Sequence, residues 1–112
     1  METAELARLE GFETAVQGQA RVVESVYCAD LLSWAMGRAP AGCAWCTVMG
    51  NVNAVAVASL ADVAALVLCE GARLDEEAHS RAEAEGIPVF LTHLPAFEAG
   101  LHIARAAGLL ER

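Results

Sequence analysis

The chain has 112 residues, which is enough for one domain with a single hydrophobic core and too few for two. Apolar residues make up 56 % of it and aromatic residues only 5 %, so the composition predicts a compact interior of small side chains and excludes a disordered chain. The net charge of −8 argues against nucleic acid or an anionic membrane as a partner, and the absence of lysine excludes a P-loop lysine or a lysine nucleophile.

Helix and strand patterns alternate along the chain, and glycine or proline separates most of them. In chain order, the pattern predicts a short helix at 3–9 capped by Thr3, strands at 12–17 and 21–28, a helix at 30–37, a strand at 43–49, a helix at 54–62, a strand at 65–69, a helix at 75–86, a strand at 87–92 and a last helix from Pro95 onward. This alternation predicts a single α/β domain over residues 1–112, with a mostly parallel sheet and helices on both faces.

Residues 54–62 fit two structures, because their apolar residues alternate as in a strand but also extend far enough for a buried helix. Parallel strands at 43–49 and 65–69 need a crossover between them, and these residues are the only chain available for it. We therefore predict a helix with Asn53 as its N-cap, just as Asp30 is predicted to cap the helix before it.

The sequence predicts an ion pair on one of the last two helices and a core face on the other. In the helix at 75–86, Glu77 and Arg81 are one turn apart and are expected to pair. In the last helix, the apolar spacing predicts a core face made of Phe97, Leu101, Ala104 and Gly108.

We expect neither an export signal nor a membrane span. Residues 1–11 lack the basic-then-apolar pattern of a signal peptide. The longest apolar run, residues 52–69, contains Asn53, Ser59 and Asp62 and is rich in alanine, which gains little on transfer into lipid. The prediction is a cytoplasmic protein whose cysteines are reduced.

Cys43 and Cys46 form a C-x-x-C pair, a spacing that occurs in redox and metal sites. That pair lies within a predicted strand, far from any helix start, so the two side chains should point to opposite faces. Cys28 and Cys69 end their strands, at the opposite edge from Cys43. We therefore predict scattered cysteines that act as small buried hydrophobic residues, with no metal and no cofactor.

Four stretches carry a resemblance to a known family: ADLLSWAMG, CAWCTVMGNVNAVAVASLADVAALVL, DEEAHSRAEAEGIPVFLT and PAFEAG. They resemble the DRTGG domains, small α/β domains similar to the amino-terminal domain of HPr kinase/phosphorylase, and the resemblance extends over about residues 21–109. Such domains also occur between CBS domains in some pyrophosphatases and as stand-alone proteins encoded near iron hydrogenases. The resemblance implies an HPr kinase N-terminal-domain-like fold and a regulatory role of the stand-alone, hydrogenase-associated type.

The chain departs from the family at the motif that names it. This motif falls on residues 21–26, which read RVVESV, with Ser25 and Val26 in place of two glycines. The cysteines are not part of the family pattern, which favours a structural role for them. A serine-kinase activity is not expected, because the chain has neither a G-x-x-x-x-G-K-[ST] motif nor any lysine.

No catalytic residue is predicted from the remaining polar side chains. Glu76 and Glu77 are adjacent on a helix and cannot face one cleft. The three histidines, His79, His93 and His102, are expected at the solvated surface.

The carboxyl edge of the sheet is where open α/β folds bind ligands. The predicted ligand-binding residues at this edge are Asp30, Ser33, Asn51, Asn53 and Thr92. Two functions stay open: a non-catalytic regulatory or interaction module with a protein partner, linked to a hydrogenase or sensory operon, and a sensor of a nucleotide-like or anionic small molecule.

A homodimer is also predicted, because a small domain cannot bury so large an apolar share by itself. The strand at 21–28 carries several valines that an edge position would leave available for pairing. The predicted dimer interface is Val22, Val23, Val26 and Tyr27.

Overall fold

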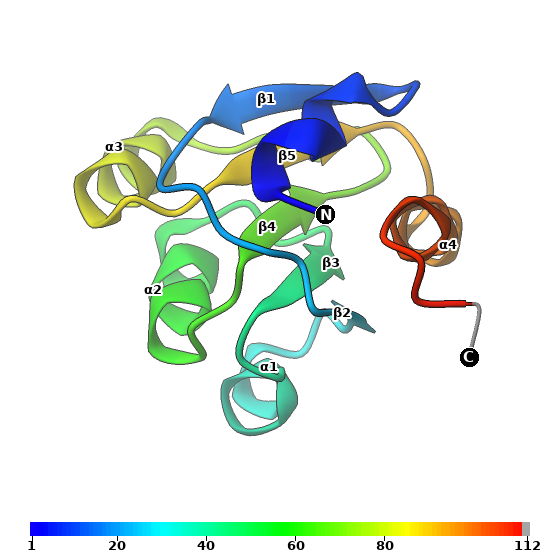
Figure 1. Ribbon diagram of the computed structural model, residues 1–112. Helices are drawn as coiled ribbons and strands as arrows, with labels where there is room; N and C mark the ends of the chain where they lie inside the picture. The colour runs from blue at the N-terminus through cyan, green and yellow to red at the C-terminus, as the bar shows by residue number, and fades with distance from the viewer. Residues whose placement is uncertain (111–112) are drawn as a thin grey trace.

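A five-stranded sheet forms the centre of the molecule (Figure 1). The computed structural model describes residues 1–110. The strands are β1 (Phe12–Val16), β2 (Ser25–Cys28), β3 (Cys43–Thr47), β4 (Ala65–Leu68) and β5 (Val89–Thr92), in the order β1-β5-β4-β3-β2. Strands β2 to β5 are parallel and β1 pairs antiparallel with β5, so the predicted α/β fold with a mostly parallel sheet is confirmed.

Helices cover both faces of this sheet. They are the 3-10 helix η1 (Thr3–Arg8) and the α-helices α1 (Leu32–Arg38), α2 (Val52–Leu60), α3 (Glu76–Glu85) and α4 (Ala96–Ala106). One core cluster joins one sheet face to α1, α2 and α3 through residues such as Ala35, Val55 and Ala82. The other joins the opposite face to η1 and α4 through Leu6 and Ile103, and Figure 1 shows α4 separated from the other α-helices by the sheet.

Strands β3 and β4 are buried on both faces, as continuous apolar runs predict. Side chains alternate between the clusters: Trp45 of β3 belongs to the cluster with α1 to α3, and Cys46 to the cluster with α4. Cys43 lies in the first cluster, so the two cysteines of the C-x-x-C pair point to opposite faces, as predicted.

Both predicted N-caps of the first two α-helices are wrong. Asn51, rather than Asn53, caps α2: it has the extended backbone that a cap requires, and its side chain accepts the N–H of Ala54 at 2.9 Å. Helix α1 begins after Leu31 without a side-chain cap, because the carboxylate of Asp30 is turned toward the loop that follows β3.

Helix α3 keeps its predicted place, but its ion pair differs. Asp75 caps it by accepting a backbone N–H of the first turn at 2.8 Å, and Gly86 ends it with a φ of 71°. Arg81 pairs with Glu85, one turn toward the carboxyl end, and not with Glu77.

The predicted core face of α4 is wrong for most of its members. Phe97 is 76 % exposed and Gly108 is also exposed, and of the predicted set only Ala104 is buried. Smaller residues face the sheet because the helix lies close to β2: a Cβ added at Gly100 would be 3.1 Å from Cγ1 of Val26. The buried residues of this helix are Ala99, Gly100, Ile103 and Ala104.

The predicted strand at 21–28 begins later than expected, because its first part pairs with the amino terminus. The N–H of Thr3 donates to the carbonyl of Arg21 at 2.7 Å, and the N–H of Val23 donates to the carbonyl of Met1 at 2.8 Å. The hydroxyl of Thr3 accepts the N–H of Arg21, so Thr3 does not cap η1, which Glu2 precedes instead. Val23 is only 3 % exposed, which corrects the expectation that it lies on an available surface.

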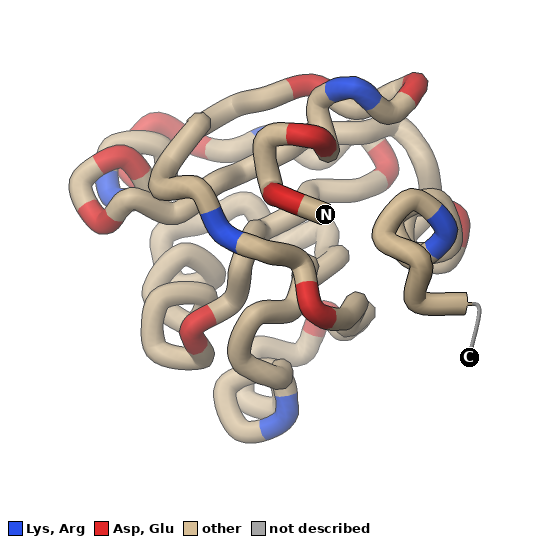
Figure 2. The backbone as a smooth tube through the Cα atoms, in the orientation of Figure 1, with Lys and Arg blue, Asp and Glu red and all other residues tan. Residues whose placement is uncertain are grey.

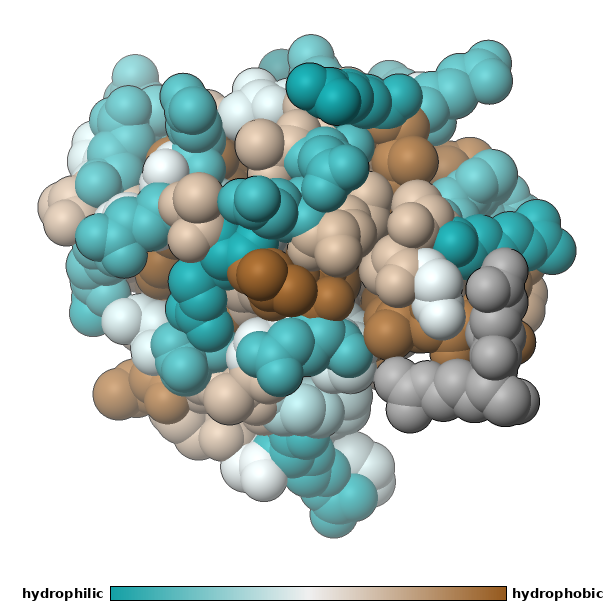
Figure 3. Space-filling model, in the orientation of Figure 1, coloured by the Kyte–Doolittle hydropathy of each residue, from teal (hydrophilic) through white to brown (hydrophobic). Residues whose placement is uncertain are grey.

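Charge and hydropathy are unevenly distributed over the surface. Figure 2 shows the arginines as isolated positions among more numerous acidic residues. On the face drawn in Figure 3, apolar atoms reach the surface over α4 and between α4 and the amino-terminal segment. Within residues 1–110, every helix is too short or too polar to cross a bilayer.

Candidate functional site

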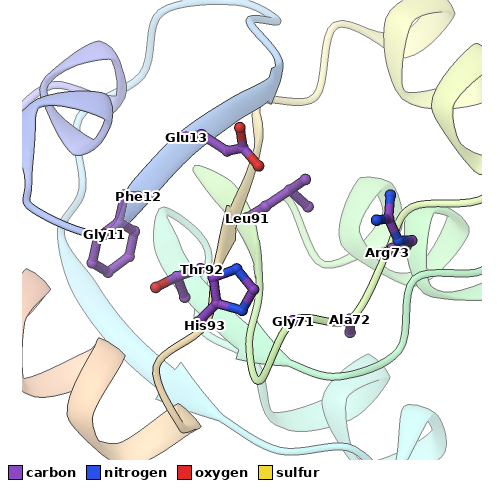
Figure 4. Close-up of a pocket in the computed structure, with 9 residues that line it drawn as sticks. All are labelled: Gly11, Phe12, Glu13, Gly71, Ala72, Arg73, Leu91, Thr92 and His93. Carbon is purple, nitrogen blue, oxygen red and sulfur yellow. The ribbon is translucent and has the colours of Figure 1, made fainter.

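A pocket of about 350 Å³ opens at the edge of the sheet where β5 ends and β1 begins (Figure 4). Phe12 pairs with Thr92 across the antiparallel β1–β5 ladder, so the start of one strand meets the carboxyl end of the other. The loop after β4 closes a further side. The volume of the pocket lies in the range of small-molecule sites, about 300–1,000 Å³. The lining residues are Gly11, Phe12, Glu13, Gly71, Ala72, Arg73, Leu91, Thr92 and His93.

The polar side chains of the pocket are one carboxylate, Glu13, and three groups that can donate, Arg73, Thr92 and His93. Figure 4 shows Arg73 and Glu13 on opposite sides of the Leu91 side chain, with the imidazole of His93 beside Gly71. Within residues 1–110, no ion pair involves Arg73 or His93. The guanidinium can bind phosphate or carboxylate with two parallel hydrogen bonds, and the imidazole can add a third. This set suits an anionic ligand with an apolar part that contacts Leu91.

The loop that carries Arg73 is held by backbone contacts on both sides. The N–H of Gly71 donates to the carbonyl of Thr92 at 3.1 Å, which ties this loop to the end of β5. The carbonyl of Gly50 accepts the N–H of Asp75 at 3.0 Å. Gly50 also lies so close that an added Cβ would be 1.9 Å from the carbonyl oxygen of Arg73. Only glycine therefore fits at residue 50 without moving the Arg73 loop.

The structure places one of the five predicted ligand residues in the pocket. Thr92 lines it, although this side chain is buried and its hydroxyl accepts the N–H of Leu94 at 3.2 Å. Asn51 caps α2 and the exposed side chains of Ser33 and Asn53 lie outside the pocket lining. A ligand role for these side chains stays a prediction.

Asp30, the fifth, lies in the turn after β2 and has a structural role. Its carboxylate accepts the hydroxyl of Thr47 at 2.9 Å and the N–H of Val48 at 3.0 Å, which joins this turn to the end of β3. In the same turn, the carbonyl of Ala29 accepts the indole N–H of Trp45 at 2.9 Å.

Sequence reasoning missed Arg73 and Glu13 as pocket residues. His93 follows β5 directly, at the carboxyl edge of the sheet, and it is exposed, as predicted. Arg73 lies farther along its loop, without any local pattern to mark it. Glu13 comes from an antiparallel strand, and only the pairing of β1 with β5 brings it to this edge.

Three cysteines lie together on the α4 side of the sheet, so the predicted scatter of the cysteines is wrong. Cys28 ends β2 and is the direct register partner of Cys46 in β3, while Cys69 follows β4. Cys46 is the register partner of Cys28 and shares its core cluster with Cys69, so it is the middle of a row that we call the cysteine row: Cys28, Cys46 and Cys69. Cys43 is on the other face. The register of neighbouring strands creates this row, and spacing along the sequence does not reveal it.

The environments of these thiols differ strongly. A hydrogen bond from Cys46 lowers the pKa of Cys28 from 9.0 to about 7 and also lowers the pKa of Cys69. The pKa of Cys46 is raised, because hydrogen bonding with Cys28 or Cys69 holds its single proton on the sulfur and because the thiol is buried. Burial is the main cause that raises the pKa of Cys43 to about 11.

Within residues 1–110, no group of three or more histidine, cysteine, aspartate or glutamate side chains is placed to hold a metal ion. Every buried side-chain nitrogen or oxygen in the same range has a hydrogen-bond partner. Of the other histidines, His79 contacts the carbonyl of Ala15 at 3.2 Å and Glu83 at 3.4 Å, and His102 is exposed. The buried polar side chains of residues 1–110 are thus engaged in the fold.

Comparison with known proteins identifies the fold. No family model matches the chain, and no curated protein matches it. Among solved structures, it is similar to the CBS and DRTGG domains of the regulatory region of the Clostridium perfringens pyrophosphatase, complexed with the activator diadenosine tetraphosphate. The two align with a TM-score of 0.71 and 15 % identity over 93 % of this chain and 46 % of that chain, so this chain spans about half of it. The fold is therefore DRTGG-like.

Proposed function

We propose that this chain is a non-catalytic regulatory module that responds to a small anionic ligand bound in the pocket between β1 and β5. The observation that carries the proposal is that Arg73 and His93 line the same pocket as Leu91 at the end of β5. The pyrophosphatase region with the same fold is itself regulatory and was solved with a nucleotide activator, which favours a nucleotide-like ligand here.

A regulatory role fits these groups better than catalysis. General acid–base or nucleophilic chemistry needs a positioned pair of reactive side chains within hydrogen-bond reach. In the pocket, the hydroxyl of Thr92 is occupied by a backbone N–H, and Glu13 lies across Leu91 from Arg73. The chain also lacks a lysine to neutralise transferred phosphate. What the pocket offers is binding, and binding that favours the folded state is enough for a sensor.

The first prediction concerns this ligand site. We expect AMP, ATP or diadenosine tetraphosphate to raise the melting temperature of the wild-type chain, with stabilisation of about 2.7 kcal/mol at a concentration 100-fold above Kd. Arg73→Ala removes the guanidinium and should weaken binding at least tenfold, because charge-assisted hydrogen bonds contribute about 1.5–3 kcal/mol. Thermal shift and titration calorimetry measure both effects.

Arg105→Ala is the matched control, since it removes the same charge from an exposed position on α4. It should leave ligand binding unchanged. Inorganic phosphate separates a simple anion site from one that also needs the apolar part of a nucleotide. A panel in which none of these compounds shifts the wild type, or in which Arg73→Ala responds like the wild type, would exclude this pocket as the ligand site.

We also propose that the module forms a homodimer through the edge of the sheet at β2. Two observations support it: β2 has a neighbouring strand on one side only, and large apolar side chains are exposed beside it. Val22 is 55 % exposed just before β2, and Leu31 and Trp34 are exposed after it. A two-fold pairing of two β2 edges would cover these side chains.

The second prediction tests this interface with Val22→Glu. The substitution puts a charge into the paired surface and should convert a dimer into a monomer at high micromolar concentration, as measured by sedimentation velocity. Leu60→Glu is the control, because Leu60 is 72 % exposed at the far end of α2 and should leave the assembly unchanged. Wild-type protein that sediments as a monomer would refute the dimer. A dimer that tolerates Val22→Glu would place the interface elsewhere, and Tyr27→Arg would then test the remainder of β2.

The association with a hydrogenase or sensory operon, the protein partner and the cytoplasmic location stay predictions. They rest on the DRTGG resemblance and the sequence composition. Co-purification of the tagged chain from its own cells tests the partner directly.

A further inference from the structure

We propose that Cys28 is a site of oxidative modification, at which a hydroperoxide oxidises the thiol and Cys46 then closes a disulfide with it. The proposal concerns the cysteine row and is independent of the ligand pocket.

Accessibility is the first step. Cys28 is exposed, whereas Cys46 and Cys69 are buried behind it. An oxidant in solution therefore reaches one thiol of the row directly and finds the second one in the next strand. Structural cysteines are usually buried and inert, and reactive ones are partly exposed in a polarised environment.

The second step is the geometry of the pair. Cys28 and Cys46 are register partners on adjacent parallel strands, and their side chains lie on the α4 side of the sheet. Neighbouring strands are about 4.8 Å apart, which lies within the Cα separation of about 4.4–6.8 Å that a disulfide spans. A disulfide needs the two Cβ atoms about 3.8 Å apart. Cys28 is the last residue of an edge strand and has a neighbouring strand on one side only.

Helix α4 holds Cys28 in this position. The thiol donates a hydrogen bond to the carbonyl oxygen of Ala96 at 3.7 Å, and a Cβ at Gly100 would be 3.3 Å from the sulfur. Neither group titrates. The titratable groups that act on Cys28 are Cys46, which donates a hydrogen bond to it, and Asp30, whose negative charge opposes ionisation. The hydrogen bond dominates, so the pKa of about 7 leaves much of Cys28 as thiolate near neutral pH.

One molecule of hydrogen peroxide is the oxidant for both steps. The Cys28 thiolate attacks one peroxide oxygen, so that an S–O bond forms, the O–O bond breaks and hydroxide leaves, taking up a proton to become water. The sulfur of Cys46 then attacks the sulfenic sulfur of Cys28, forming the S–S bond while the S–O bond breaks. The hydroxyl leaves with the proton of Cys46 as a second water. Two thiols and hydrogen peroxide thus give one disulfide and two waters, and a thiol reductant reverses the change.

The test uses the full chain, hydrogen peroxide and iodoacetamide, with peptide mapping by mass spectrometry. We expect stoichiometric peroxide to remove 2 Da from the intact mass and to link the peptides of Cys28 and Cys46. Iodoacetamide should label Cys28 before the other cysteines, with a rate that rises with pH and reaches half its maximum near pH 7.

Two alanine variants of buried cysteines form a matched pair. Cys46→Ala should abolish the linkage, leave a sulfenic acid on Cys28 that dimedone traps, and move the midpoint of labelling upward toward pH 9. Cys43→Ala, which removes an equally buried thiol from the other face, should change neither readout. Circular dichroism confirms that each variant is folded. Wild-type labelling of Cys28 with a midpoint near pH 9, or a peroxide product without the Cys28–Cys46 link, overturns the proposal and needs no variant.

Discussion

Gly50→Ala should destabilise the fold by about 3 kcal/mol and abolish ligand binding in the pocket between β1 and β5. The added Cβ would be 1.9 Å from the carbonyl oxygen of Arg73 and 3.1 Å from a methyl carbon of Leu68. The first of these contacts is with backbone, so a side-chain rotation cannot relieve it. Either β3 and its following turn move, or the loop that carries Arg73 moves away. Chemical denaturation measures the loss, and the calorimetric titration measures the effect on binding.

Gly37→Ala is the matched control, because nothing lies within 4 Å of a Cβ built there. Gly37 is inside α1, where alanine is favoured over glycine by about 0.5–1 kcal/mol, so this variant should be as stable as the wild type or slightly more stable. If Gly50→Ala were as stable as the wild type and bound ligand normally, the Arg73 loop would have room to relax, and glycine at residue 50 would not be needed to form the pocket.

The central part of the fold could be predicted because its signals are local. Residues 65–68 form a continuous apolar run, which is typical of a strand buried on both faces, and β4 is such a strand. Acidic residues at the start of α3 and Gly86 at its end mark that helix in the sequence alone. The crossover requirement then placed α2 between β3 and β4, although the cap was Asn51 instead of Asn53.

The errors arise where a contact between distant segments decides the outcome. Helix α4 has apolar residues on two sides, and periodicity alone favoured the larger ones, including Phe97. The structure buries the side with Gly100, since only small residues allow α4 to approach Val26 and Cys28 of β2. The cysteine row and the position of Glu13 depend in the same way on strand pairing, which no local pattern contains.

Trp45→Ala should cost about 3–5 kcal/mol, a large part of the stability of a small domain, which is only about 5–15 kcal/mol. Trp45 is the largest fully buried side chain of the described residues, at 0 % exposure, and α1 and α2 contribute only alanines and valines to the buried part of its core cluster. Such small side chains cannot rearrange to fill the space of an indole, so the cavity stays open and its cost is high. Urea denaturation followed by circular dichroism measures the difference.

Two further tryptophan variants serve as comparisons. Trp34→Ala tests the general effect of removing an indole, and Trp45→Phe separates the contribution of packing from that of the hydrogen bond. Trp34→Ala changes a side chain that is 52 % exposed on α1 and stacks on Arg38, so it should cost about 1 kcal/mol or less. Trp45→Phe keeps most of the buried ring but leaves the carbonyl of Ala29 without the N–H that it accepts at 2.9 Å. It should cost clearly less than Trp45→Ala, with about 1 kcal/mol of the loss due to the hydrogen bond. If Trp45→Phe were as damaging as Trp45→Ala, the turn at Ala29 would depend on that hydrogen bond, and the size of the indole would not be what stabilises β2 beside β3.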